Sequence, residues 1–141
     1  MGSSKGGVLY GTWSGKVTEG SDARLKVDIH NIQDNYQSFY DKLIPRGYKY
    51  LKPIDENTGY RFGFIAQEVL NALEESGLPT DWAAVQTDMT TDYLSLAYTE
   101  FIALNTWQIQ KLKPRMTAAE QEIASLKLEI QRLRAELEAL K

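Results

Sequence analysis

The chain has 141 residues, a formal net charge of −3 and no cysteine. A chain of this length suits one small globular unit followed by a protruding helix. The absence of cysteine excludes disulfides, thiol catalysis and the usual zinc sites. The acidic balance, without a cluster of basic residues, argues against nucleic acid as the main partner.

Targeting segments are not evident in the sequence. No run of about eighteen apolar residues occurs, as a membrane-spanning helix would need. Met1–Gly7 lacks the apolar centre of a signal peptide. We interpret this leader as vector-derived or as the cut end of a longer protein.

The first third of the chain predicts short strands, a turn and a helix. Residues 8–17 have the pattern of one or two strands interrupted by glycine, and Glu19–Asp22 predicts a turn. Apolar and polar side chains alternate over residues 25–29, which predicts a half-buried strand. The spacing of apolar residues over Asn31–Leu43 predicts a helix, which Pro45 ends.

The middle of the chain predicts a hairpin followed by a helix. Tyr48–Leu51 and Tyr60–Phe64 resemble strands, and Asp55–Gly59 has the composition of the loop between them. The second strand leads into a helix over Ala66–Ser76. Gly77 follows it in the position that a left-handed helix cap requires.

The chain then predicts short extended segments and one long helix. A strand is expected at Ala84–Gln86, and residues 94–97 alternate apolar with small or polar side chains. Thr99 suits the N-cap of the long helix. Pro114 lies inside that helix and lacks the backbone N–H, so we expect a kink or a local break there.

The long helix has the heptad pattern of a coiled coil. Apolar residues recur at alternating spacings of three and four, with Asn105 as an exception at a core position. Position a holds Ile102, Ile109, Met116, Ile123, Ile130 and Leu137, and position d holds Leu112, Ala119, Leu126, Leu133 and Leu140.

Charged residues beside this seam indicate a parallel, in-register homo-oligomer, because each g residue would face an e residue of opposite sign. The pairs are Arg115 with Glu120, Glu122 with Lys127, Glu129 with Arg134 and Glu136 with Lys141. Ile at a with Leu at d favours two strands, whereas Ala119 and the mixed a layer leave three open. The pattern alone does not decide between a dimer and a trimer.

Few residues suit catalysis. His30 is the only histidine, and its place on the polar side of the predicted strand favours an ordinary surface role. The sequence has no glycine-rich phosphate loop and no metal-ligand spacing, so we expect no cofactor and no metal. The remaining candidate for chemistry is the segment Ser21–Lys26.

Two motifs and a terminal coil occur in a specific order. Ser21–Lys26 reads Ser-Asp-Ala-Arg-Leu-Lys, and Gly63–Val69 reads Gly-Phe-Ile-Ala-Gln-Glu-Val. A strand with Tyr48 and Tyr50 lies between them, and Tyr98 opens the terminal helix. From Ser21 onward, this order resembles the C-terminal intramolecular chaperone domain of phage tailspikes, endosialidases and tail fibres.

The resemblance implies a function and a site. Such a domain trimerises, aids the folding of an upstream β-rich fibre, and then cuts itself off as a single-turnover serine–lysine endopeptidase. On this sequence the nucleophile would be Ser21, its base Lys26, and the scissile bond Gly20–Ser21. The implied partners are two further copies and the fibre passenger, with no nucleic acid and no membrane. The implied location is the host cytoplasm during phage assembly, and the domain would be absent from the mature fibre.

The chemistry of the dyad sets requirements for the structure. A serine hydroxyl is a weak nucleophile until a base takes its proton, and a lysine amine must be desolvated to act as that base. We therefore expect subunit packing to bury Lys26, so that cleavage would follow assembly. Residues five apart share no face of a strand, so Ser21 must curl back from the turn. Gly20 suits a strained scissile bond that is closely approached.

Other motif residues have expected supporting roles. Asp22 could orient Lys26, and Arg24, Gln67 and Glu68 are expected to serve in packing or hydrogen bonding.

The sequence thus predicts an α+β fold, a small mixed domain with short strands and helices, followed by a long helix that forms a parallel trimeric coiled coil. We divide the chain into a leader and passenger stub (1–20), a chaperone domain (21–113) and the coiled coil (114–141). The main alternative is a structural trimerisation or attachment module that does not cleave itself. A dimeric coil that binds DNA is disfavoured by the net charge.

Overall fold

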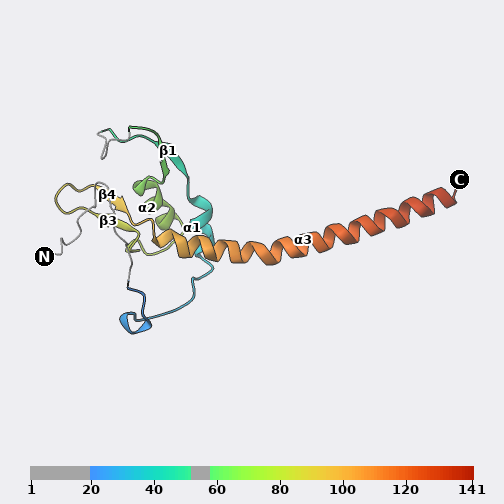
Figure 1. Ribbon diagram of the computed structural model, residues 1–141, viewed down its shortest axis with the longest axis horizontal. Coiled ribbons are helices and arrows are strands. Elements are labelled where there is room, and N and C mark those ends of the chain that lie inside the picture. Colours follow the sequence, from blue (N-terminus) through green and yellow to red (C-terminus); the bar gives the residue numbers. More distant parts are fainter. Residues whose placement is uncertain (1–19, 52–57) are drawn as a thin grey trace. The chain divides into compact units, whose positions relative to one another are not determined.

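The structure, a computed structural model, describes residues 20–51 and 58–141, and it combines short strands with helices, as the predicted α+β class requires. The predicted strands over residues 8–17 and the loop residues 55–57 lie outside the described residues. In chain order the elements are η1 (Ala23–Leu25, a 3₁₀ turn), α1 (Tyr36–Lys42), β1 (Arg46–Tyr48), β2 (Arg61–Gly63), α2 (Ala66–Glu75), β3 (Val85–Thr87), β4 (Leu94–Leu96) and α3 (Glu100–Ala139) (Figure 1).

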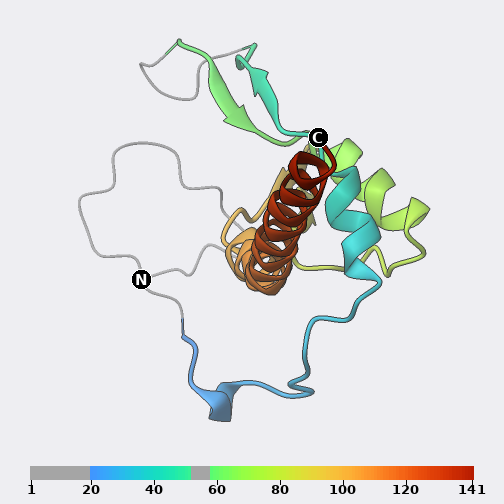
Figure 2. The same cartoon turned by 90° about the vertical axis from the view of Figure 1, so that its right-hand side faces the viewer.

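The chain divides into two compact units, one that ends at Tyr98 and one that comprises Thr99–Lys141. The strands of the first unit form two separate antiparallel pairs, β1 with β2 and β3 with β4. The first pair aligns Tyr48 with Arg61, so the predicted hairpin forms (Figure 2). Its first strand lies earlier than predicted, because β1 shares only Tyr48 with the expected strand Tyr48–Leu51. The second pair joins β3, which lies one residue after the strand expected at Ala84–Gln86, to β4 within the alternating segment 94–97.

The core of the first unit lies around α2. The buried face of this helix carries Val69 and Leu73, and it contacts α1, β3 and β4. Phe39 of α1 is also fully buried, and its ring packs edge-on against Trp82 with centroids 5.4 Å apart. Full burial of such a side chain stabilises the fold by about 1.5–3 kcal/mol.

The end of α2 confirms the predicted glycine cap. Gly77 has a φ of 67°, a left-handed conformation that side chains with a Cβ rarely adopt. The Gly77 N–H donates to the Glu74 carbonyl, and the Leu78 N–H donates to the Leu73 carbonyl, both at 3.0 Å. Leu78 is itself buried, so this Schellman arrangement ends the helix and returns the chain to the core.

Of two predictions for the segment before β1, the strand was wrong and the helix is confirmed in part. Residues 25–29 form no strand: residues 23–25 are a 3₁₀ turn, and Asp28 has a left-handed φ of 54°, which interrupts an extended path. The predicted helix over Asn31–Leu43 is shorter, because only Tyr36–Lys42 is α-helical. A periodic pattern gives the face that a segment would bury but does not supply a partner element to bury it against.

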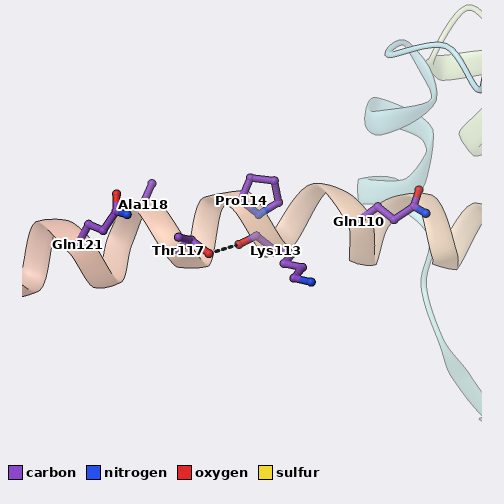
Figure 3. A pocket seen from close by; sticks show the side chains of 6 residues that line it. All are labelled: Gln110, Lys113, Pro114, Thr117, Ala118 and Gln121. Carbon is purple, nitrogen blue, oxygen red and sulfur yellow. Dashed lines mark hydrogen bonds between the residues drawn. The ribbon is translucent and has the colours of Figure 1, made fainter.

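The second unit is one continuous helix, so the expected break at Pro114 does not occur. Figure 3 shows the Pro114 ring within an unbroken ribbon, where the Thr117 hydroxyl donates to the Lys113 carbonyl at 3.2 Å. A proline removes one N–H donor from the ladder, and the many remaining bonds continue the helix. The shallow hollow beside Pro114 is lined by α3 alone, so it has no opposite wall to enclose a ligand.

Among the described residues, the helices include none with both the length and the apolar composition to cross a membrane.

Three tyrosines, Tyr48, Tyr50 and Tyr98, form a cluster. Within it, Tyr98 contacts Phe64, the residue that follows β2. The Tyr98 hydroxyl accepts a hydrogen bond from the Phe64 N–H at 3.0 Å. It also donates one to the Phe64 carbonyl oxygen at 3.3 Å. The Tyr98 ring stacks on Phe64. Burial, together with hydrogen bonds to Tyr50 and Tyr98, raises the pKa of Tyr48, so its hydroxyl stays protonated. A Cβ on Gly63 would overlap the Tyr98 hydroxyl, so a side chain there would fit only if Tyr98 moved.

We expect Gly63→Ala to lower the free energy of unfolding by about 1–3 kcal/mol, because the new methyl group must displace Tyr98 from its hydrogen bonds with Phe64. Urea unfolding followed by tyrosine and tryptophan fluorescence measures the change. Gly47→Ala is the matched control in the paired strand, since its Cβ would lie 3.4 Å from the Phe62 ring, an ordinary contact. Equal stability of the two variants would contradict this role of Gly63.

Candidate functional site

The segment Ser21–Lys26 folds back on itself in a capped turn. The Asp22 carboxylate accepts a hydrogen bond from the Arg24 N–H at 2.9 Å, which makes Asp22 the N-cap of η1. The Lys26 N–H then donates to the Ala23 carbonyl at 3.1 Å. Short polar side chains such as Asp favour this local bonding over an extended strand. The turn therefore folds the chain back on itself within these few residues.

This turn brings the two predicted dyad residues together. The Lys26 Nζ donates a hydrogen bond to the Ser21 Oγ at 2.8 Å, across a separation of five residues. A base must lie within hydrogen-bond reach of the proton that it removes, and this contact meets that requirement. Gly20, the other side of the predicted scissile bond, is approached closely, because a Cβ there would lie 3.2 Å from the Leu25 Cδ1.

Asp22 and Arg24 form an ion pair with each other. The Arg24 guanidinium donates to both carboxylate oxygens of Asp22, at 3.0 Å and 2.7 Å. These hydrogen bonds hold the pKa of the Asp22 carboxyl below its ordinary value and raise the pKa of Arg24. The carboxylate of Asp22 thus pairs with Arg24 rather than with Lys26, which differs from the orienting role expected for it. It shapes the turn instead.

The second motif, Gly63–Val69, contacts the β1–β2 hairpin rather than the turn Ser21–Lys26, which we call the dyad turn. Glu68, in the first turn of α2, accepts two hydrogen bonds from Arg46 of β1, at 2.6 Å and 3.1 Å. The hydrogen bonds from Arg46 lower the pKa of the Glu68 carboxyl. Gln67 is exposed on the same helix. Sequence reasoning missed Arg46, because no local pattern pairs residues that are 22 positions apart.

Water reaches the dyad turn in one copy of the chain. Ser21 and Lys26 are exposed, and so are the apolar side chains that follow, with exposed fractions of 72% for Leu25, 91% for Val27 and 71% for Ile29. An ammonium group donates hydrogen bonds but has no lone pair to take up a proton, and removal of water favours the neutral amine. The geometry of the dyad is therefore present in one copy, and its desolvation is not.

The other polar residues near this segment suggest no second centre. The His30 Nδ1 lies 2.7 Å from the Asp28 carbonyl, a local contact on an exposed segment. Over residues 20–51 and 58–141, no group of three or more histidine or acidic side chains is placed to hold a metal ion.

Two comparisons with known proteins find similarity to chaperones. Residues 21–78 match the family described as the chaperone of endosialidase. A crystal structure described as a novel intramolecular chaperone shares 25% sequence identity and aligns with a TM-score of 0.54, over 67% of this chain and 99% of its own. No curated protein matches the chain. The matched segment contains the dyad turn, the hairpin and α2. Over residues 21–78 the chain is therefore similar in sequence to the chaperone of endosialidase, and its fold is similar to that of an intramolecular chaperone.

Proposed function

We propose that this domain trimerises through α3, aids the folding of an upstream phage fibre or spike, and then releases itself by cleaving the Gly20–Ser21 bond. The observation that carries the cleavage is the 2.8 Å hydrogen bond between Lys26 Nζ and Ser21 Oγ. The family match supports the chaperone role. The domain would act in the host cytoplasm during phage assembly and be absent from the finished fibre.

The proposed reaction needs only residues of this turn and water. The neutral amine of Lys26 takes the hydroxyl proton of Ser21, and the Oγ attacks the carbonyl carbon of Gly20. The tetrahedral intermediate breaks its bond to the Ser21 nitrogen, which receives the proton from Lys26. Gly20 is then held as an ester on the Ser21 Oγ. Water hydrolyses this ester, which leaves a carboxylate on Gly20 and a free amine and hydroxyl on Ser21.

Assembly would supply the missing desolvation. The exposed apolar side chains of Leu25, Val27 and Ile29 flank Lys26 in sequence, so any partner surface that covers them also removes water from the dyad turn. Cleavage by an exposed lysine is disfavoured, and cleavage after assembly is favoured. This ordering would protect the passenger from early loss of its chaperone.

The exposed seam of α3 supports self-association through this helix, whereas the number of three copies rests on the resemblance to the chaperone family. The larger apolar side chains at positions a and d, from Ile102 to Leu140, have exposed fractions between 47% and 84%. Such a continuous apolar stripe on a soluble chain marks an interaction surface. In one copy, Arg132 pairs with Glu136 at 2.7 Å and with Glu129 at 3.6 Å. These exposed pairs are weak enough to rearrange toward another copy, since each contributes about 0.2–1 kcal/mol.

We expect the intact chain of 16.0 kDa to yield a fragment that begins at Ser21, while Ser21→Ala and Lys26→Ala stay intact. Loss of either the nucleophile or its base should slow cleavage by at least about a hundredfold. Intact mass spectrometry of the incubated protein measures both products. Hydroxylamine should accelerate cleavage of the wild type by attacking the ester and should leave a hydroxamate on Gly20.

Ser125→Ala and Lys42→Ala are the matched controls, because both residues are exposed and lie outside the dyad turn. Both should cleave at the wild-type rate. A wild type that is trimeric and keeps its full mass would refute self-cleavage, and the non-cleaving trimerisation module would then be the better description.

We expect sedimentation equilibrium to give a trimer, and Ile130→Asp to dissociate it. A charge in the seam has no partner in the assembled core, which costs about 3–5 kcal/mol. The control is Leu128→Asp, since Leu128 lies at the outer heptad position f and is 68% exposed. Cleavage should be lost with Ile130→Asp and kept with Leu128→Asp. A wild-type dimer, or an Ile130→Asp monomer that still cleaves at the normal rate, would contradict cleavage coupled to trimer assembly.

A further inference from the structure

Leu25 lies against Gly20, the residue on the acyl side of the proposed scissile bond. A Cβ on Gly20 would lie 3.2 Å from the Leu25 Cδ1. Carbon atoms pack best at about 3.5–4.0 Å, so a side chain there would displace the leucine or be displaced by it. We propose that Leu25 sets the specificity of self-cleavage by excluding a side chain from residue 20, an inference that rests on the proposed cleavage of the Gly20–Ser21 bond.

The turn that forms the dyad also forms this contact. Ser21 and Lys26 are five positions apart, and their side chains are joined by the 2.8 Å hydrogen bond. Gly20 and Leu25 have the same separation in the sequence. Because the two pairs enclose the same backbone, a turn that brings one pair together also brings the other together. The geometry that supplies the base therefore places a leucine beside the acyl residue.

The turn holds the backbone of Leu25 in place. The Leu25 N–H donates to the Asp22 carbonyl at 3.0 Å, and the Lys26 N–H donates to the Ala23 carbonyl at 3.1 Å. Moving this backbone aside would break these bonds and would draw Lys26 away from Ser21. A larger residue at position 20 therefore leaves two responses, which are rotation of the leucine side chain and a shift of the scissile carbonyl away from the Ser21 Oγ.

Rotation of the leucine is easy in one copy and would be difficult after assembly. Leu25 is 72% exposed, so its side chain can turn toward water. In the proposed function, a partner surface covers this leucine when it desolvates Lys26. A packed side chain can no longer turn aside without overlap. The exclusion would then be strongest in the state that cleaves.

This exclusion defines the substrate class. The proposed reaction transfers the acyl group of residue 20 to the Ser21 Oγ before water hydrolyses the ester. A carbonyl that is pushed out of line with its nucleophile reacts more slowly, even when the displacement is small. The bond that is cut best is therefore a peptide bond with glycine on its acyl side, and the released passenger would end in glycine.

Exchanging the sizes of the two residues tests the contact. Gly20→Ala adds a methyl group, Leu25→Ala removes the opposing side chain, and the double variant combines the changes. The chains are made by cell-free synthesis, recovered uncleaved in urea and refolded by dilution. Intact mass spectrometry follows the fragment that begins at Ser21. Rates are compared at chain concentrations where they no longer depend on concentration, so that cleavage rather than assembly is timed.

We expect Gly20→Ala to slow cleavage about tenfold in the presence of Leu25, because the added methyl group overpacks the contact. In the Leu25→Ala background, the same change should slow cleavage only about twofold, since the opposing side chain is gone. Leu25→Val should give an intermediate ratio. A purely structural role of the leucine would lower both rates equally and leave their ratio unchanged.

Val27→Ala is the matched control. Val27 is an apolar residue of the same exposed segment, is 91% exposed, and does not approach Gly20. Loss of either apolar side chain can weaken assembly and lower the absolute rate, so only the ratio between glycine and alanine at position 20 is compared. In the Val27→Ala background, that ratio should stay at about tenfold, as with the unchanged segment.

The outcomes separate this inference from the proposed function. Cleavage of Gly20→Ala at the wild-type rate, or an equal ratio in the Leu25→Ala and Val27→Ala backgrounds, would refute the role of Leu25 and leave self-cleavage standing. A wild type that cleaves as a monomer, with a ratio that depends on Leu25, would support this role and refute coupling to assembly. A wild type that assembles and stays intact would refute both.

Discussion

The fold of the first unit depends on the contact between the Tyr98 hydroxyl and the backbone of Phe64. These residues are 34 positions apart, and the contact joins the end of β2 to the residue that precedes the N-cap of α3. Phe64 also lies two residues before α2, so one phenol group positions the chain on both sides of the core helix. The absence of a side chain at Gly63 is what lets the ring approach this closely. Packing therefore accounts for the glycine that opens the second motif.

The dyad turn depends on a different kind of interaction, which is local. Its hydrogen bonds, including the contact of Lys26 with Ser21, all join residues within the same short segment. A nucleophile and base arranged in this way can form before the rest of the chain has folded, since closing a loop of so few residues is fast. Such a site needs a second condition to delay its reaction. In the proposed mechanism, exposure to water would supply that condition in one copy, and burial would remove it.

Local signals account for the part of the fold that the sequence predicted well. The α2 helix and its Gly77 cap follow from side-chain spacing and from backbone freedom at one residue, and the β1–β2 hairpin follows from two short strands around a turn. The strand expected over residues 25–29 failed because alternation cannot show whether a pairing strand exists. In the candidate site, the Ser21–Lys26 contact followed from the motif, whereas the preference of Asp22 for Arg24 depends on the turn geometry that only the structure reveals.

The exposed segment that follows Lys26 also fits the proposed order of assembly and cleavage. A segment that alternates apolar and polar residues is adapted to being half-buried, yet here it remains exposed next to Lys26. In a single chain this exposure is unfavourable. Covering the segment would lower the free energy by about 25 cal/mol for each Å² of apolar surface buried. The same burial desolvates the neighbouring amine, which costs far less when the amine is neutral. Association and activation of the base would then be two results of one change in solvent exposure, and neither would need a separate trigger.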